Sequence, residues 1–210
     1  MKINYKTINY AFQLVSKFSK LYNIDESHSL RHSLDVYHNA CEIYKSEIHS
    51  SPFLKNQQNE IFCSAILHDM CDVKYTNQTT ALKSLNFFMQ NHINAEEIKI
   101  VNNIVTTMSY SKVKERGFPD LGEFNLAYHI VREADMLAAY DVERCFVYKM
   151  INQKDLYDIA IMDVIDLFEN RVLKYIDDDM FVTDFSKEKA KKLHKDAVKR
   201  LDEIKNNALF

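Results

Sequence analysis

The stretch IFCSAILHD, residues 61–69, joins a run of apolar side chains to an adjacent histidine and aspartate. The apolar run predicts a buried helix. An ionisable pair at the end of such a helix is costly unless a compensating group lies next to it. A divalent cation would compensate both side chains, so His68 and Asp69 are the first candidates for a metal site.

Helical spacing continues outward from this stretch over nearly the whole chain. Apolar residues recur at steps of three and four, and only two Gly and two Pro occur in 210 residues, which leaves few positions for tight turns and hairpins. The pattern predicts an all-α fold, a bundle of about seven to eight helices. We expect them at about 7–22, 30–48, 59 onward, 80–91, 94–108, 126–138, 155–176 and 186–206.

Local signals refine two of these boundaries. Asn94 and Glu97 have the spacing of a capping box at the start of a helix. Helical spacing stops between residues 109 and 122, where three of the four Gly and Pro residues lie. We expect the one substantial loop there, with Lys112 and Lys114 facing solvent because lysine is seldom buried.

Composition and charge exclude several classes of protein. A formal net charge of −3 gives no overall field that would attract nucleic acid, and the basic side chains of 186–206 are interpreted as the solvated face of an amphipathic helix. No apolar run is long enough to span a membrane, and the first residues lack the apolar core of a signal peptide. The four Cys occur singly, without a CxxC pair, so we expect reduced thiols and a cytoplasmic protein.

Two further predicted helices carry ionisable side chains among apolar ones. His32 lies among the leucines of the second helix with His28 one turn earlier, and Asp135 lies on the apolar side of the sixth. Together with His68 and Asp69, they offer two imidazole nitrogens and two carboxylates for one ion. This set suits a single divalent ion of Mn, Mg, Fe, Ni or Zn, with positions left for water and phosphate oxygens.

Four short motifs resemble those of a known family. They are SHSLRHSLDV at 27–36, LHD at 67–69, SYS at 109–111 and EADML at 133–137. The order of a histidine, a His-Asp pair and an aspartate on separate helices resembles the HD superfamily of metal-dependent phosphohydrolases. The strings are most similar to its small bacterial and viral hydrolases. The motifs cover about residues 27–140, two thirds of the chain.

The resemblance implies a role for each residue that matches a motif. It makes His32, His68, Asp69 and Asp135 the ligands of one divalent metal ion. Relatives often have a histidine just before the SYS segment, where this chain has Met108. We therefore expect one metal ion and no second, histidine-rich site.

The resemblance also implies catalytic and substrate-binding residues. Members of the family commonly protonate the leaving group with a carboxylate three positions after the His-Asp pair, which is Asp72 here, and His28 would face the same cavity. Arg31, Lys74 and, in the expected loop, Lys112 or Lys114 are the nearest candidate cations for a phosphate group, although a solvated position is favoured for the two loop lysines. Glu133 is interpreted as a hydrogen-bonding support of the metal ligands.

The resulting hypothesis is a single HD domain over residues 1–210. Helices within 155–206 would pack on the motif core of 27–140 and could pair with a second copy in a homodimer. The reaction implied is hydrolysis of a phosphate ester of a small molecule, above all a nucleotide, by a metal-activated water. Nucleotide monophosphatase, alarmone pyrophosphohydrolase and cyclic-nucleotide phosphodiesterase activities all stay open. The alternatives are a non-catalytic HD module that binds a nucleotide or protein partner, and a structural helical adaptor.

Overall fold

The computed structural model describes residues 5–25, 28–152 and 156–208. Over these ranges the fold is all α, as predicted, and has ten α-helices and no β-strand, slightly more helices than expected. Ser27 of the first motif and Asp155, the expected start of a helix, lie outside the described residues.

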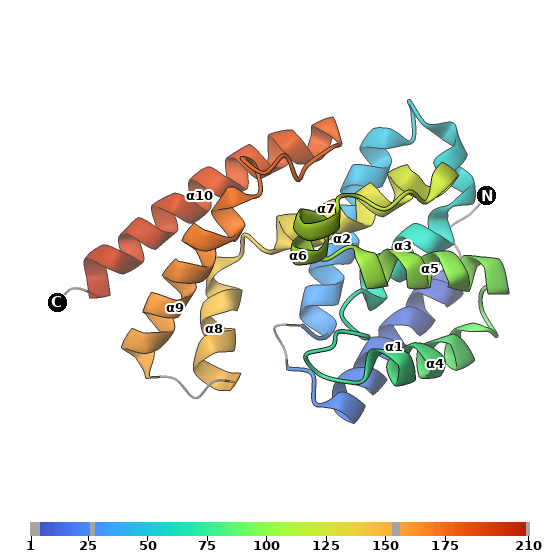
Figure 1. Ribbon diagram of the computed structural model, residues 1–210, viewed down its shortest axis with the longest axis horizontal. Helices are drawn as coiled ribbons and strands as arrows, with labels where there is room; N and C mark the ends of the chain where they lie inside the picture. The colour runs from blue at the N-terminus through green and yellow to red at the C-terminus, as the bar shows by residue number, and fades with distance from the viewer. Residues whose placement is uncertain (1–4, 26–27, 153–155, 209–210) are drawn as a thin grey trace.

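The α-helices (Figure 1) are α1 (Tyr5–Tyr22), α2 (Leu30–Glu47), α3 (Gln58–Leu67), α4 (Gln78–Met89), α5 (Ala95–Thr107), α6 (Tyr110–Arg116), α7 (Asn125–Ala138), α8 (Val142–Asn152), α9 (Tyr157–Asn170) and α10 (Asp184–Ala208). Short 3-10 helices are η1 (Pro52–Asn56), η2 (Gly122–Phe124) and η3 (Val172–Lys174).

Helix α3 forms the centre of the fold. Nine of its ten residues are buried, including Ile61 through Leu67. It packs against α1, α2, α5 and α7, which together cover it on all sides. A helix that is apolar all round is stable only inside such an arrangement. The prediction of a buried helix here is confirmed, and its C-terminal end places His68 deep inside the protein.

The His-Asp pair lies just beyond α3 rather than within it. The helix ends at Leu67. The next backbone hydrogen bonds span three residues, from Met70 N to the Leu67 carbonyl at 3.0 Å and from Asp72 N to the Asp69 carbonyl at 3.2 Å. Bonds of this span tighten a chain into turns. His68 and Asp69 are thus held by a turn at the end of the most buried helix.

The expected loop over 109–122 is partly wrong, because its first half is helix α6. Tyr110 and Val113 are buried from one side of this helix, which is too short to show a repeating apolar pattern. Gly117, with a φ of 77°, ends it in the left-handed region that favours glycine. Lys114 is half exposed and forms an ion pair with Asp178 at 2.8 Å.

The expected helix over 155–176 is also wrong in its bounds. The structure has α9 and then the separate 3-10 helix η3 in that range, and the sequence analysis missed α8 before it. Helix α8 packs on α9, and α10 packs on α2, α7, α8 and α9. Figure 1 shows α8, α9 and α10 on one side of the molecule and α1 to α5 on the other. Pairing with a second copy stays a prediction.

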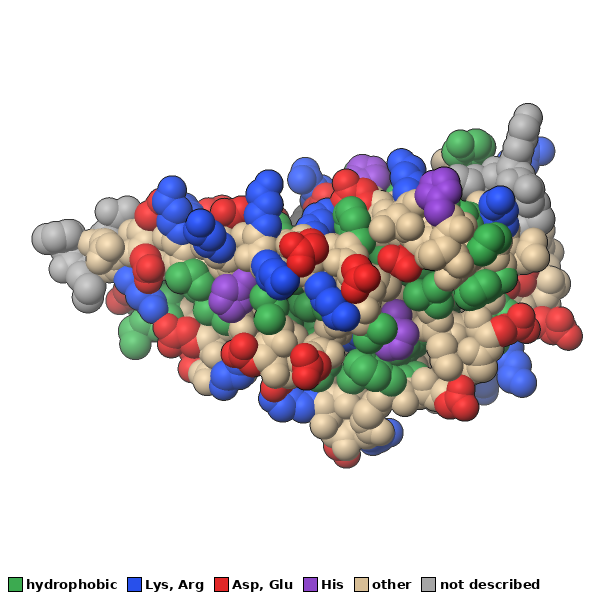
Figure 2. Space-filling view, turned by 90° about the horizontal axis from the view of Figure 1, so that it is seen from above, with side chains coloured by type: hydrophobic (Ala, Val, Ile, Leu, Met, Phe, Trp, Pro, Cys, Tyr) green, Lys and Arg blue, Asp and Glu red, His purple; other side chains and the backbone are tan. Residues whose placement is uncertain are grey.

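The surface carries mixed charge. Figure 2 shows basic and acidic side chains interspersed over the coloured part of the face seen there. On α10, Lys191 pairs with Glu188 and Lys205 with Glu169. None of the helices within the described residues has the length and apolar character needed to cross a membrane. All four cysteines are free, as predicted.

A buried acid on α7 fastens the C-terminal segment to the core. The Glu133 carboxylate is fully buried and accepts hydrogen bonds from Val182 N at 2.7 Å, from Thr183 N at 3.2 Å and from the Thr183 hydroxyl at 2.6 Å. Its neighbour Arg132 is equally buried and donates to the Met180 carbonyl. The interpretation of Glu133 as a support of the metal ligands is therefore wrong, because its bonds anchor the chain just before α10.

Glu133→Ala should lower the free energy of unfolding by about 3–5 kcal/mol, because it leaves the buried Arg132 without its nearby carboxylate and removes the acceptor for residues 182–183. Urea unfolding followed by circular dichroism measures the change. Glu188→Ala is the matched control, since the Glu188 side chain is 75% exposed and its ion pair with Lys191 contributes little. Equal stability of the two variants would refute the anchor.

Candidate metal centre

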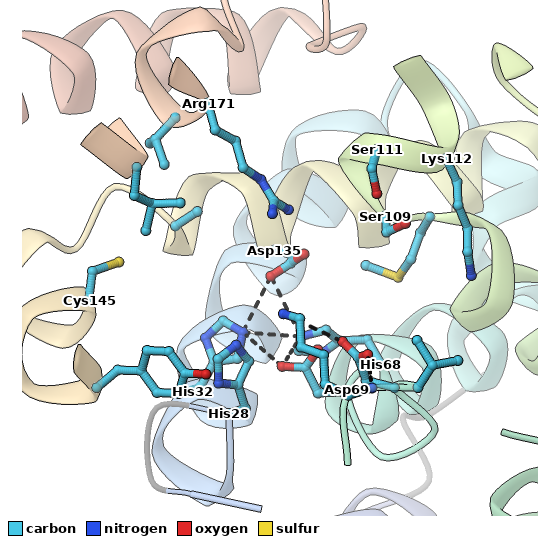
Figure 3. Close-up of a pocket in the computed structure, with 18 of the residues that line it drawn as sticks. His28, His32, His68, Asp69, Ser109, Ser111, Lys112, Asp135, Cys145 and Arg171 are labelled. Carbon is cyan, nitrogen blue, oxygen red and sulfur yellow. Dashed lines mark hydrogen bonds and ion pairs between the residues drawn. The ribbon is translucent and has the colours of Figure 1, made fainter. Parts of the chain in front are cut away.

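Four side chains from three separate segments meet at one point (Figure 3). His32 comes from α2, His68 and Asp69 from the turn after α3, and Asp135 from α7. The Nε2 atoms of the two imidazoles lie 3.1 Å apart. Asp69 Oδ2 is 3.1 Å from His68 Nε2 and 3.4 Å from His32 Nε2, and Asp135 Oδ1 is 3.5 and 3.3 Å from the same two atoms. The structure therefore brings together all four residues that the sequence analysis singled out as ligands.

Helices α2 and α7 are held in register next to this cluster. The two helices pack along each other, and the Asn39 side chain on α2 donates a hydrogen bond to the Ala134 carbonyl on α7 at 3.0 Å. Ala134 directly precedes Asp135, and Asn39 lies two turns after His32. This bond fixes where the Asp135 carboxylate stands relative to the His32 imidazole. The sequence analysis missed Asn39, which no motif contains.

Backbone contact sets the proton position on one imidazole. His68 Nδ1 lies 2.9 Å from the Ala65 carbonyl oxygen. Because a carbonyl oxygen only accepts, Nδ1 must carry the proton. In the neutral ring the lone pair is then on Nε2, the atom that faces the cluster. A backbone carbonyl that orients an imidazole in this way is typical of metal-binding histidines.

The donor atoms fit a metal ion. Ligand atoms of His32, His68 and Asp135 all lie within 4.8 Å of one another, so this group could hold one ion. Two ligands at about 2.0–2.2 Å from a common ion are expected to lie roughly 3–4 Å apart, which matches the distances in the cluster. In addition, Asp69 Oδ2 is buried and accepts no hydrogen bond from the described residues, although it points between the two imidazoles.

The electrostatics of the cluster favour positive charge. Burial lowers the pKa of His32, so its ring is neutral at pH 7. Burial also opposes charge on His68, but the carboxylates of Asp69 and Asp135 outweigh it and raise the pKa of His68 to about 9. Burial opposes ionisation of the two acids as well, yet His68 holds the pKa of Asp69 below its usual range and that of Asp135 at about 2. Two ionised carboxylates thus draw positive charge to this point, which either a proton on His68 or a bound cation can supply.

The cluster lies in the wall of a cavity of about 450 Å³. Of the other sequence-predicted residues, His28, Asp72 and Lys74 also line this cavity. Arg31 does not: its side chain is 76% exposed and pairs with Asp35 at 3.0 Å. The structure thus places Arg31 outside the site, because its direction on α2 differs from that of its neighbour His32.

The sequence analysis missed several parts of the cavity wall. Lys112, interpreted as a solvent-facing loop residue, lines the cavity from α6 and donates to the Thr106 carbonyl at 2.7 Å, so that interpretation is wrong. The C-terminal part of the chain adds Arg144, Tyr148, Lys149, Arg171 and Tyr175. These residues lie beyond the motifs, and the sequence contains no signal for the direction in which they point.

His32→Ala should abolish stoichiometric binding of Mn²⁺, because it removes one of two imidazoles that share the site. Metal content after dialysis against Mn²⁺, measured by elemental analysis, tests this. His38→Ala is the matched control on the same helix, where the His38 side chain is exposed and outside the cluster. Both variants should keep their helical circular dichroism. Retention of one Mn²⁺ per chain in His32→Ala would rule out this centre.

Comparison with known proteins adds no relative. No protein-family model matches the chain, and no curated protein matches its sequence. The resemblance to the HD superfamily thus depends on the motifs alone, and the chemical interpretation of the site depends on the geometry of His32, His68, Asp69 and Asp135.

Proposed function

We propose that this protein is a metal-dependent phosphohydrolase of the HD type that cleaves a phosphate ester of a small molecule, above all a nucleotide. The observation that carries the proposal is the convergence of two imidazoles and two carboxylates on the wall of one cavity. A cavity of about 450 Å³ has a volume in the range of small-molecule sites. The ligand set of nitrogen and carboxylate oxygen is the kind that divalent ions use in hydrolases.

Each residue of the site would have its own role in binding the ion or the substrate. His32, His68, Asp69 and Asp135 would hold the cation. When bound, a divalent ion would supply the positive charge that lowers the pKa of a water molecule and offsets charge on a reacting phosphoryl group. The hydrogen bond from His68 Nδ1 to the Ala65 carbonyl keeps that ring oriented throughout. The His68 ring is thus already oriented with Nε2 toward the cluster.

We propose that Asp72 acts on the leaving group. It lines the cavity in the same turn as the His-Asp pair, and its Oδ1 accepts a hydrogen bond from Lys74 N at 2.9 Å. A carboxyl group there could protonate a departing alkoxide. His28 lines the cavity beside the cluster, with its Nδ1 3.0 Å from the Tyr75 hydroxyl and its ring 6.0 Å from that of His32. We propose that His28 orients a water molecule or a phosphate oxygen.

Asp69→Asn should abolish metal-dependent hydrolysis, because it removes a charge that the cation requires. Wild-type protein treated with EDTA and then reloaded with Mn²⁺ is assayed against nucleotide mono-, di- and cyclic phosphates by release of phosphate or nucleoside. Asp196→Asn, an exposed change on α10, serves as the control. Binding of a nucleotide without turnover by the wild type would instead support the non-catalytic module.

Asp72→Asn should slow hydrolysis in a way that depends on the leaving group. A poor leaving group such as an alkoxide needs a proton, so kcat should fall about 10²- to 10⁴-fold, whereas p-nitrophenolate leaves without one. Comparison of kcat for a nucleoside monophosphate and for p-nitrophenyl phosphate tests this with Mn²⁺ content unchanged. An equal loss for both substrates would exclude Asp72 as the proton donor.

A further inference from the structure

Arg171 is a cation on the cavity wall that the motifs and the proposed chemistry leave unused. It follows α9 directly, and its side chain forms no ion pair with the described carboxylates. The three lysines that line the same cavity each have a partner. Lys74 pairs with Asp72, Lys149 pairs with Asp163, and Lys112 donates a hydrogen bond to a backbone carbonyl. Arg171 differs from these lysines because its side chain bonds to the Tyr175 hydroxyl, which leaves its positive charge without a carboxylate partner among the described residues.

The backbone around Arg171 is firmly held. Its N–H donates to the Leu167 carbonyl at 3.0 Å, which closes the last turn of α9. Phe168 and Val172 on either side are buried in the core. The backbone from which the Arg171 side chain starts is thus held in place. Figure 3 shows the Arg171 guanidinium extending from its helix across the cavity toward Asp135, opposite the two imidazoles.

The surroundings keep this guanidinium charged and half-buried. Burial opposes its charge, but Tyr175 and Asp135 outweigh burial and raise the pKa of Arg171. The Tyr110 ring lies 5.4 Å from the guanidinium carbon on another side. A half-buried charge without a paired carboxylate is costly, and an anionic ligand would remove that cost. The planar guanidinium fork matches two oxygens of a phosphate group.

The charge of the whole lining also suits an anion. Five basic side chains line the cavity against three carboxylates, and two of those carboxylates belong to the metal cluster. Three of the five cations are Arg144, Lys149 and Arg171, which come from α8 and from the end of α9. The cavity thus has the four candidate metal ligands on one wall and basic side chains from the C-terminal part of the chain on another.

We propose that Arg171 binds a phosphate group of the substrate directly, from the wall opposite the metal cluster. The phosphate would lie between the guanidinium and Asp135, where its oxygens reach both the fork and the cation site. This inference rests on the proposed function, since it assumes a phosphorylated ligand in this cavity. It assigns a substrate-binding role to a residue outside the motif core, in place of Arg31.

The test is the affinity for inorganic phosphate of the full chain loaded with Mn²⁺, measured by calorimetry and by ³¹P NMR titration. Arg171→Gln should raise the Kd for phosphate by about tenfold to a hundredfold, the usual loss for hydrogen bonds to a charged group. Its Mn²⁺ content should stay at the wild-type value. The control is Arg116→Gln, whose side chain is 73% exposed on α6 and lies outside the cavity; its Kd should change less than twofold.

Arg171→Lys keeps the charge but loses the fork, and it should give an intermediate Kd. An unchanged Kd in Arg171→Gln overturns the assignment; if that variant does not fold, an unchanged Kd in Arg171→Lys does so. Loss of Mn²⁺ together with phosphate in the folded variants would also overturn it, because a structural role predicts that result. A wild type that holds no Mn²⁺ after dialysis but still binds phosphate refutes the metal centre, while the variants still decide on Arg171. No phosphate binding by a wild type that holds one Mn²⁺ overturns the Arg171 assignment and leaves the metal centre standing.

Discussion

The central constraint on this structure is that two carboxylates, which repel each other, lie close together beside a buried helix. Asp69 and Asp135 both contact the imidazoles of His32 and His68, and repulsion between the two acids is offset only by positive charge at that point. Three helices must end or pass at one place for this to occur. The arrangement of α2, α3 and α7 around the core is therefore also the arrangement of the site.

Elements with a strong local signal were predictable from the sequence. The buried helix α3 follows from its unbroken apolar run, and the capping box at α5 is present, with Asn94 Oδ1 accepting from Glu97 N at 2.9 Å and Asn94 N donating to the Glu97 carboxylate at 2.7 Å. The convergence of the four candidate ligands also agrees with the expectation, because helical spacing puts His32 and Asp135 on the apolar faces of their helices.

Other features could not be predicted because they depend on direction or on tertiary packing. Arg31 is next to His32 in the chain, yet a step of about 100° along a helix turns it to solvent. Lys112 looked like a surface residue because α6 is too short to show a period. The wall formed by Arg144 and Arg171 arises only when α8 and α9 pack beside the core.

The bonds that Glu133 makes have a consequence for the limits of the folding unit. One residue, Ala134, separates this acid from Asp135 along α7, and its partners lie near residue 182. A fragment confined to the four motifs would lack the partners that Arg132 and Glu133 have near residue 182, so the part of α7 that carries Asp135 would lose these contacts. The segment around residue 182 is therefore part of the same folding unit as the motif region.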